Sequence, residues 1–216
     1  MGAKKNMNKQ ALIIIDMENG FINQESAQCI KMAAQTVDRC AAAASEARKR
    51  GIPVIFVNRI YRKSGVDVEH TRYRAWYDGG RAMSEDCEKV IDSNNPIGLS
   101  PEKKDIVIIK PRFSAFFMTE LDLILRRLGI DTVILTGTTT PNCIRTTCYD
   151  AISLDYNVIV IDDCCSSQTE EIQRANIFDM KNIGAHIITA DDFIANKYEL
   201  EYDSLAVCQE EVRNGI

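Results

Sequence analysis

The chain has 216 residues, of which 45% are hydrophobic, and its formal net charge is −5 at pH 7. This length allows one sizeable core, so we expect a single domain over residues 1–216. The acidic balance argues against a nucleic-acid partner, because phosphate binding depends mainly on Lys and Arg, and favours a small molecule.

Short β-branched runs alternate with longer helical patterns along most of the chain, which is typical of βαβ units in a parallel sheet. Several runs are apolar throughout, as strands buried on both faces should be. The expected strands are Ala11–Ile15, Pro53–Val57, Ile106–Ile109, Thr132–Leu135, Val158–Ile161 and Ala185–Ile188. The sequence therefore predicts an α/β fold.

The first apolar run also bears on location. It covers only Ala11–Ile15 before Asp16 interrupts it, which is too short for a signal peptide or a membrane span. We expect a cytoplasmic protein with no membrane contact.

Apolar residues at helical spacing predict the crossover helices. One begins near Ile30 and ends before Gly51, and another covers Phe117 to Leu128 ahead of Gly129. A further helix begins near Cys143 and runs to about Leu154. The last follows Thr169, whose side chain can cap it.

The stretch Asn58–Lys104 is much longer than the usual connection in an α/β unit. We expect some helix in it, around Ser84–Ile91. It also contains the single Trp, Trp76, together with Tyr73 and other tyrosines. Long loops with their own aromatic residues often serve as lids or subunit contacts, and both roles are open here.

Three polar residues stand at or just beyond strand ends. Asp16 follows the first strand, Lys110 follows the third, and Cys143 lies a few residues after the fourth. Ligands of open parallel sheets bind beyond the carboxyl ends of the strands. If these strands are neighbours, an acid, a base and a thiol meet in one crevice, which is the minimal set for nucleophilic attack on a carbonyl.

Each of the three has a chemical task in such a site. A helix N-terminus and the ammonium of Lys110 would favour the thiolate of Cys143. Asp16 can take the thiol proton and later give it to the leaving nitrogen if burial raises its pKa. The glycine and threonine segment before Cys143 can present backbone N–H groups to an oxyanion.

Plainer interpretations exist for all of these residues. An Asp after a strand is often a helix cap, a lysine is usually solvated, and a cysteine is usually a small buried hydrophobe. Arg145 can clamp a substrate carboxylate or form a surface salt bridge. Phe21, Tyr73 and Trp76 can line an apolar substrate slot or anchor a subunit contact. Together with Arg145, they are the four candidate substrate-binding residues.

The cysteine and histidine content bears on cofactors. Eight cysteines without a C-x-x-C pair indicate reduced thiols, not a disulfide framework or a zinc site. Only His70 and His186 could supply nitrogen ligands, and no G-x-G-x-x-G loop follows a strand. We expect neither a metal nor an organic cofactor.

Three motifs in this chain resemble those of the isochorismatase-like cysteine hydrolases, and the likeness covers nearly the whole sequence. They are Leu12-Ile13-Ile14-Ile15-Asp16-Met17-Glu18-Asn19-Gly20-Phe21, then Lys110-Pro111-Arg112-Phe113-Ser114-Ala115-Phe116, then Gly137 through Cys143-Ile144-Arg145. The resemblance implies a doubly wound three-layer sandwich with a six-stranded parallel sheet, and a homodimer or homotetramer.

The resemblance also implies roles for individual residues. Asp16, Lys110 and Cys143 would form the catalytic triad. The peptide bond between Thr138 and Thr139 would be cis, and the N–H groups of Thr139 and Cys143 would form the oxyanion hole.

Departures from the family pattern narrow the expected activity. Members that hydrolyse a vinyl ether lack the nucleophilic cysteine, whereas this chain has Cys143. Family nicotinamidases carry a metal-binding D-x-H pair and a further His, whereas this chain reads Asn58-Arg59-Ile60-Tyr61 with His70 alone. The Cys143-Ile144-Arg145 run is more similar to the N-carbamoylsarcosine amidase branch.

We therefore expect a cysteine-dependent amidohydrolase that cleaves a C–N bond of a small amide, carbamoyl or ureido substrate through a thioester. A nicotinamidase-like hydrolase and a non-enzymatic thiol-sensing protein on the same fold are the alternatives.

Overall fold

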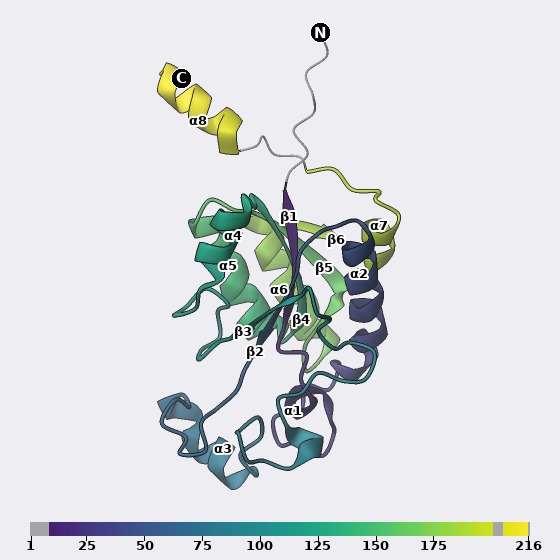
Figure 1. Ribbon diagram of the computed structural model, residues 1–216, viewed down its shortest axis with the longest axis vertical. Helices are drawn as coiled ribbons and strands as arrows, with labels where there is room; N and C mark the ends of the chain where they lie inside the picture. Colours follow the sequence, from purple (N-terminus) through teal and green to yellow (C-terminus); the bar gives the residue numbers. More distant parts are fainter. Residues whose placement is uncertain (1–8, 201–204, 216) are drawn as a thin grey trace.

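A parallel six-stranded sheet forms the centre of the protein (Figure 1). The computed structural model describes residues 9–200 and 205–215. The strand order is β3-β2-β1-β4-β5-β6, and every neighbouring pair is parallel. The strands are β1 (Gln10–Ile15), β2 (Val54–Asn58), β3 (Ile106–Ile109), β4 (Thr132–Thr138), β5 (Asn157–Ser166) and β6 (His186–Ile188). The predicted α/β class is confirmed.

Helices cover both faces of this sheet, as a doubly wound fold requires. In Figure 1, α2 and α7 lie on one side, and α4, α5 and α6 lie on the other. The α-helices are α1 (Asn19–Ile22), α2 (Val37–Lys49), α3 (Tyr73–Asp78), α4 (Leu121–Leu128), α5 (Arg145–Ser153), α6 (Glu170–Asn182), α7 (Ala190–Ile194) and α8 (Leu205–Asn214). None of these described helices is long and apolar enough to cross a membrane.

The uniformly apolar β1 is explained by its central place in the sheet. Ile13 and Ile15 pack into the cluster on the α4–α6 side, while Leu12 and Ile14 pack into the cluster on the α2–α7 side. All four side chains are fully buried. A strand with helices on both faces needs apolar side chains at every position, so it shows no polar alternation.

The crossover from β1 to β2 differs from the single long helix expected from Ile30 onward. The α-helix begins only at Val37, after a 3₁₀ turn, η1 (Ala34–Thr36). The N–H of Ile30 donates to the carbonyl of Phe21 (2.8 Å). Because this donor is used outside a helix, the segment near Ile30 packs as a loop and the helix is shorter than predicted.

The helix expected from Phe117 to Leu128 begins later, at Leu121. Phe117 lies outside it and is 52% exposed. Its end is as predicted, because Gly129 takes a left-handed conformation with φ of 66°. The cap at Thr169 is also confirmed, since its side chain accepts from the backbone N–H of Ile172.

The long segment between β2 and β3 contains helix α3, which the sequence did not predict. The expected helix over Ser84–Ile91 is wrong, apart from a 3₁₀ turn, η3 (Lys89–Ile91). The N–H of Met83 donates to the carbonyl of Ile91 (2.9 Å), so backbone pairing within a loop replaces helical bonding there.

This segment shares an apolar cluster with residues 21–33, beyond the carboxyl ends of the strands in Figure 1. The buried members are Phe21, Ile30, Ala33, Tyr61, Val68, Trp76, Ala82, Met83 and Ile91. The segment is therefore packed as a folded cover next to the sheet edge where Asp16, Lys110 and Cys143 stand.

Gly137 permits a close approach between β1 and β4 at that edge. Its φ is 114°, and a Cβ at this position would lie 2.1 Å from the carbonyl oxygen of Ile15. The neighbouring residue, Asp16, also has a positive φ of 51°, which Asp tolerates better than most side chains. Two residues with positive φ, Gly137 on β4 and Asp16 just after β1, thus shape this edge of the sheet.

We expect Gly137→Ala to lower the free energy of unfolding by at least about 2 kcal/mol, because the methyl group meets backbone atoms that cannot move aside. Gly184→Ala is the matched control, since Gly184 has a φ of 109° but no atom within 4 Å of a built Cβ. Urea unfolding of both variants would measure the difference. Equal losses would show that φ alone, and not the contact with Ile15, sets the requirement for glycine.

Candidate active site

Asp16, Lys110 and Cys143 meet at the carboxyl edge of the sheet. The ammonium of Lys110 donates to Asp16 Oδ2 (2.8 Å) and lies 3.6 Å from the sulfur of Cys143. Asp16 and Lys110 are fully buried, and Cys143 is 4% exposed. A carboxylate, an ammonium and a thiol are therefore gathered in a site shielded from bulk water.

The strand order differs from the simple case of three adjacent strands. β1 and β4 are neighbours, but β2 separates β3 from β1. Strands are about 4.8 Å apart, so the side chains of Lys110 and Asp16 together bridge roughly 10 Å between the backbones of β3 and β1. The long lysine side chain makes this contact possible, whereas a shorter cationic side chain would not reach Asp16.

All three N–H donors of Lys110 are in use. Besides Asp16 and Cys143, the ammonium donates to the carbonyl oxygen of Arg112 (2.9 Å). This carbonyl belongs to the turn that follows Lys110, so the motif itself fixes the ammonium. By contrast, Asp16 Oδ1 has no hydrogen-bond partner among the described residues, and this buried oxygen can receive a proton.

Cys143 lies in a π-helical turn, η4 (Thr140–Ile144), which leads into α5. Burial, and then the charge of Asp16, raise the pKa of the Cys143 thiol, while Lys110 and Arg59 act in the opposite direction. Lys110 favours the thiolate, as expected, but burial and the charge of Asp16 outweigh it, so the pKa of the Cys143 thiol is raised overall.

The peptide bond between Thr138 and Thr139 is cis, as the family resemblance implied. The hydroxyl groups of Thr139 and Thr140 both donate to the carbonyl oxygen of Ser166, at 3.2 and 3.0 Å. These bonds fix the loop before Cys143 to the end of β5. Thr138, Thr139 and Thr140 are buried, whereas Asn142, which directly precedes Cys143, is exposed.

Glu18 is a buried acid at the site that the sequence analysis did not single out. It is fully buried, and its Oε1 accepts from the backbone N–H of Arg59 (2.8 Å). Burial and the charge of Asp16 raise the pKa of Glu18 well above its usual range. Burial therefore favours the protonated form of Glu18, whose Oε2 has no hydrogen-bond partner among the described residues.

Arg59 is a second residue that the sequence analysis did not assign to the site. It follows β2, is fully buried, and its Nη2 lies 3.9 Å from the sulfur of Cys143. Its Nη1 contacts the Tyr61 hydroxyl (2.7 Å) and Glu69 Oε1 (2.5 Å). The only signal in the sequence was the departure from the family's D-x-H pattern at this position.

Of the aromatic residues predicted to line a substrate slot, Tyr73 and Trp76 lie in the cover and Phe21 lies on α1. Trp76 is 2% exposed, donates from Nε1 to the carbonyl of Ala82, and packs against Tyr73. Phe21 belongs to the same apolar cluster. In the described part of the chain, none of the three has a hydrogen bond or ring contact with Cys143. The aromatic rings near the site are instead those of Phe113 and Tyr61, 5.2 and 5.6 Å from the Arg59 guanidinium.

Arg145 forms the surface salt bridge that was one of its two interpretations. Its Nη2 lies 2.5 Å from Asp179 Oδ2 on α6, and the Arg145 side chain is 41% exposed. The guanidinium also stacks over the ring of Tyr149. These contacts hold α5 against α6, so Arg145 is engaged away from the sulfur. His70 is exposed in the cover segment.

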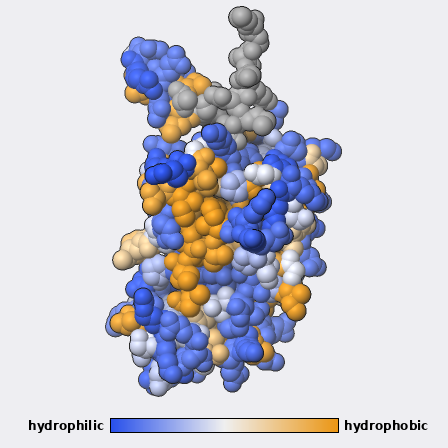
Figure 2. All heavy atoms as spheres, viewed as in Figure 1, coloured by the Kyte–Doolittle hydropathy of each residue, from blue (hydrophilic) through white to orange (hydrophobic). Residues whose placement is uncertain are grey.

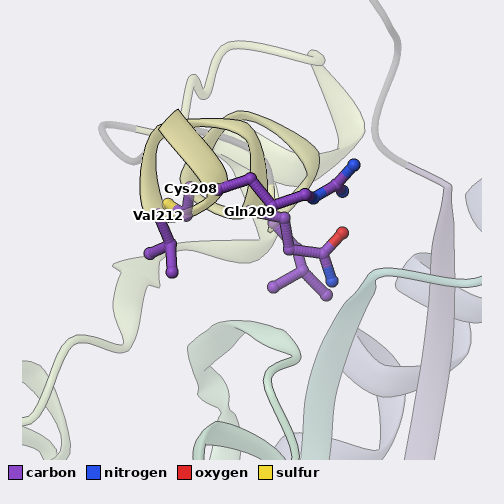
Figure 3. A pocket seen from close by; sticks show the side chains of 5 residues that line it. Cys208, Gln209 and Val212 are labelled. Carbon is purple, nitrogen blue, oxygen red and sulfur yellow. The ribbon is translucent and has the colours of Figure 1, made fainter. Parts of the chain in front are cut away.

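Other surface features lie away from this cluster. Figure 3 shows a hollow lined by residues of α8, among them Cys208, Gln209 and Val212. It contains none of Asp16, Lys110 and Cys143. No group of three or more His, Cys, Asp or Glu side chains in the described residues is arranged to hold a metal ion.

Replacing Asp16 with Asn is expected to lower the pKa of Cys143, because the charge that opposes thiolate formation is removed. Alkylation of Cys143 by iodoacetamide at pH 7 should then be about tenfold faster. In the wild type, the alkylation rate should keep rising with pH beyond the range of an ordinary thiol. The rates are measured by mass spectrometry of the Cys143 peptide.

Asp163→Asn is the matched control for this experiment. Asp163 is also a strand carboxylate in an ion pair, with Arg39 at 2.6 Å, but has no contact with Cys143. It should leave the alkylation of Cys143 unchanged. A slower reaction in Asp16→Asn would contradict the electrostatic account.

Comparisons with known proteins agree with the fold and the motifs. A family model described as the isochorismatase domain matches residues 10–192. An Arabidopsis thaliana protein named "Probable inactive nicotinamidase" is 38% identical over 185 residues, covering 85% of this chain and 93% of its own.

Two solved structures are also similar. An isochorismatase family protein from Desulfovibrio vulgaris is 36% identical with a TM-score of 0.82, covering 88% of this chain and 98% of its own. The N-carbamoylsarcosine amidase from Thermoplasma acidophilum is 30% identical with a TM-score of 0.71, covering 85% of this chain and 97% of its own. With the sheet order and the three motifs, these matches show that the chain belongs to the isochorismatase-like hydrolase family.

Proposed function

We propose that the protein is a cysteine-dependent amidohydrolase that cleaves a C–N bond of a small amide, carbamoyl or ureido substrate. The contact that carries this proposal is the cluster in which Lys110 touches both Asp16 and the sulfur of Cys143. A nucleophile, a proton acceptor and a fixed cation within contact distance are what acyl transfer requires.

In the first half-reaction, Asp16 takes the proton of the Cys143 thiol and the sulfur attacks the substrate carbonyl carbon. Because burial raises the pKa of the thiol, proton transfer to the carboxylate accompanies the attack. The carbonyl π electrons move to oxygen. When they return, the C–N bond breaks, and the nitrogen leaves with the proton from Asp16. A thioester on Cys143 remains.

In the second half-reaction, Asp16 acts as the base again. It takes a proton from water, whose oxygen attacks the thioester carbon; the C–S bond breaks, and the sulfur recovers the proton. For a carbamoyl substrate, one water is consumed, and the products are an amine, carbon dioxide and ammonia. Lys110 holds the carboxylate and the sulfur in position through both steps.

The N–H groups of Thr139 and Cys143 are the proposed oxyanion hole. The side-chain bonds of Thr139 and Thr140 to Ser166 hold this loop and leave its backbone in a fixed place beside the sulfur. Preorganised donors of this kind contribute roughly 3 kcal/mol each to transition-state stabilisation in well-studied hydrolases.

Two alternatives deserve a test alongside this one. A nicotinamidase-like activity would use the same nucleophile on a different amide. The other alternative is a non-enzymatic protein on this fold in which Cys143 is a reactive thiol; the Arabidopsis relative is named a probable inactive nicotinamidase. The buried Asp16–Lys110 pair supports the enzyme, because a thiol sensor needs no proton shuttle.

The decisive measurement is ammonia release from a panel that includes ureido acids, biuret-like compounds, nicotinamide and maleamate. We expect Cys143→Ala to lower the rate on the best substrate by at least about 1000-fold, because no other group can form the thioester. Cys148→Ala is the matched control, since Cys148 is buried one helical turn later and should leave turnover intact. Wild-type turnover in Cys143→Ala would end the covalent mechanism.

We propose further that the chain is one domain and that the segment 58–104 acts as a lid. In this segment, Arg59 contacts the sulfur of Cys143, and Tyr61 and Glu69 hydrogen-bond with Arg59. Both Arg59 and Cys143 are buried, so a substrate needs the cover to open. These contacts favour the lid over the subunit-contact interpretation.

For the expected homodimer or homotetramer, we propose a contact through β3 and α4. Figure 2 shows an apolar band over the place where these two elements lie in Figure 1. Val107 and Ile109 on β3 are 50% and 54% exposed, and Leu123 on α4 is 66% exposed. An exposed apolar edge strand beside an apolar helix is a surface that association would bury.

Leu123→Glu should therefore shift the protein toward the monomer, because a charge would be buried in the contact. Light scattering coupled to size-exclusion chromatography measures the mass. Val66→Glu is the comparison, since Val66 is 77% exposed on the 58–104 segment. Dissociation by Val66→Glu, with no effect of Leu123→Glu, would assign the subunit contact to the cover instead.

A further inference from the structure

Arg59 and Lys110 are both buried cations beside Cys143, yet they differ in how many of their donors are used. Lys110 has three donors and three partners. Arg59 has five N–H donors, and its two oxygen partners, on Tyr61 and Glu69, both contact Nη1. Arg59 therefore retains unused donors and Lys110 does not.

The unused donors of Arg59 lie along one edge of the guanidinium. Nε is buried and has no hydrogen-bond partner among the described residues. Nη2 has only the long 3.9 Å contact to the sulfur of Cys143. Nε–H and one Nη2–H point in parallel, which is the geometry that binds the two oxygens of a carboxylate.

The surroundings of Arg59 keep this edge in place. Glu69 and the Tyr61 hydroxyl hold the Nη1 corner, and a further bond joins the Tyr61 hydroxyl to Glu69 Oε2 (3.0 Å). The ring of Phe113 lies 5.2 Å from the guanidinium carbon. An acceptor bound at this edge would leave both bonds of Nη1 in place.

Leaving a charged donor buried without an acceptor is costly, so an unpaired edge beside a nucleophile indicates a ligand that completes it. We propose that Arg59 is a specificity-determining residue that binds the carboxylate of a compact anionic amide, placing its carbonyl carbon at Cys143. The reaction in this inference rests on the proposed amidohydrolase function. The preference for binding an anion does not depend on it.

The distances favour a short substrate. A carboxylate oxygen would lie about 2.8 Å from Nη2, and a carbon under attack lies about 3–3.5 Å from the sulfur. With Nη2 only 3.9 Å from the sulfur, the carboxylate and the attacked carbon need be separated by only a few bonds.

Alkylation with two reagents tests this inference without requiring turnover. Iodoacetate carries a carboxylate next to the carbon that sulfur attacks, and iodoacetamide is its neutral counterpart; each loses iodide as the C–S bond forms. The measured quantity is the ratio of the two rates at Cys143, from mass spectrometry of its peptide. This ratio cancels the thiolate fraction, because both reagents sample the same thiol. Cys208, exposed on α8, gives the reference ratio in the same sample.

In the wild type, the iodoacetate-to-iodoacetamide ratio should be higher at Cys143 than at Cys208. Arg59→Lys keeps the charge but loses the two-donor edge, and should lower the ratio. The double variant Arg59→Gln/Glu69→Gln removes both members of the ion pair, so that no lone charge is left buried. Its ratio at Cys143 should fall by about tenfold.

Arg72→Gln is the matched control. The Arg72 guanidinium also lies over Phe113 (5.6 Å) but donates to Gln28, and it has no contact with Cys143. Its ratio should equal that of the wild type. A wild-type ratio at Cys143 no higher than at Cys208, or a ratio unchanged in both Arg59 variants, would overturn the inference.

The outcomes separate this inference from the proposed function. An Arg59-dependent preference for iodoacetate in a protein that releases no ammonia would keep the anion site and reject the amidohydrolase. Ammonia release without such a preference would keep the enzyme and reject Arg59 as the carboxylate-binding residue.

Discussion

The buried ion pair between Lys110 and Asp16 is the contact on which the rest of the site depends. Both side chains are excluded from water, so neither charge is tolerable without the other. Removing one partner of such a pair typically costs about 3–5 kcal/mol. Because the same ammonium also contacts the sulfur of Cys143, the interaction that satisfies the buried charges also orients the nucleophile.

A second buried pair, Arg59 with Glu69, also lies near the sulfur of Cys143. The first pair comes from the ends of β1 and β3, and the second comes from the segment that covers them. The nucleophile is thus placed between a part of the sheet that is rigid by strand pairing and a cover packed on a small apolar cluster shared with residues 21–33. This division suits a site in which the chemistry is fixed while the cover decides which substrate is admitted.

Much of the fold and part of the site could be predicted from the sequence. A strand such as β1, buried on both faces, must be apolar at every position, so its residues identify it locally. A charged residue that ends an apolar strand then has to lie at the carboxyl edge of the sheet, which places Asp16 after the buried β1 and Lys110 after β3, an edge strand whose Val107 and Ile109 are exposed. The glycines and caps that end helices, such as Gly129 and Thr169, are local signals as well.

The remainder was decided only by tertiary structure. Glu18 and Arg59 look like ordinary surface charges in the sequence, and the pKa of Glu18 is raised because distant strands and the cover exclude water around it. Arg145 could clamp a ligand or pair with a neighbouring helix, and only the packing of α5 on α6 gave it Asp179. Sequence determines which groups end the strands; the electrostatic state of each group depends on burial and on partners far along the chain, which no local pattern records.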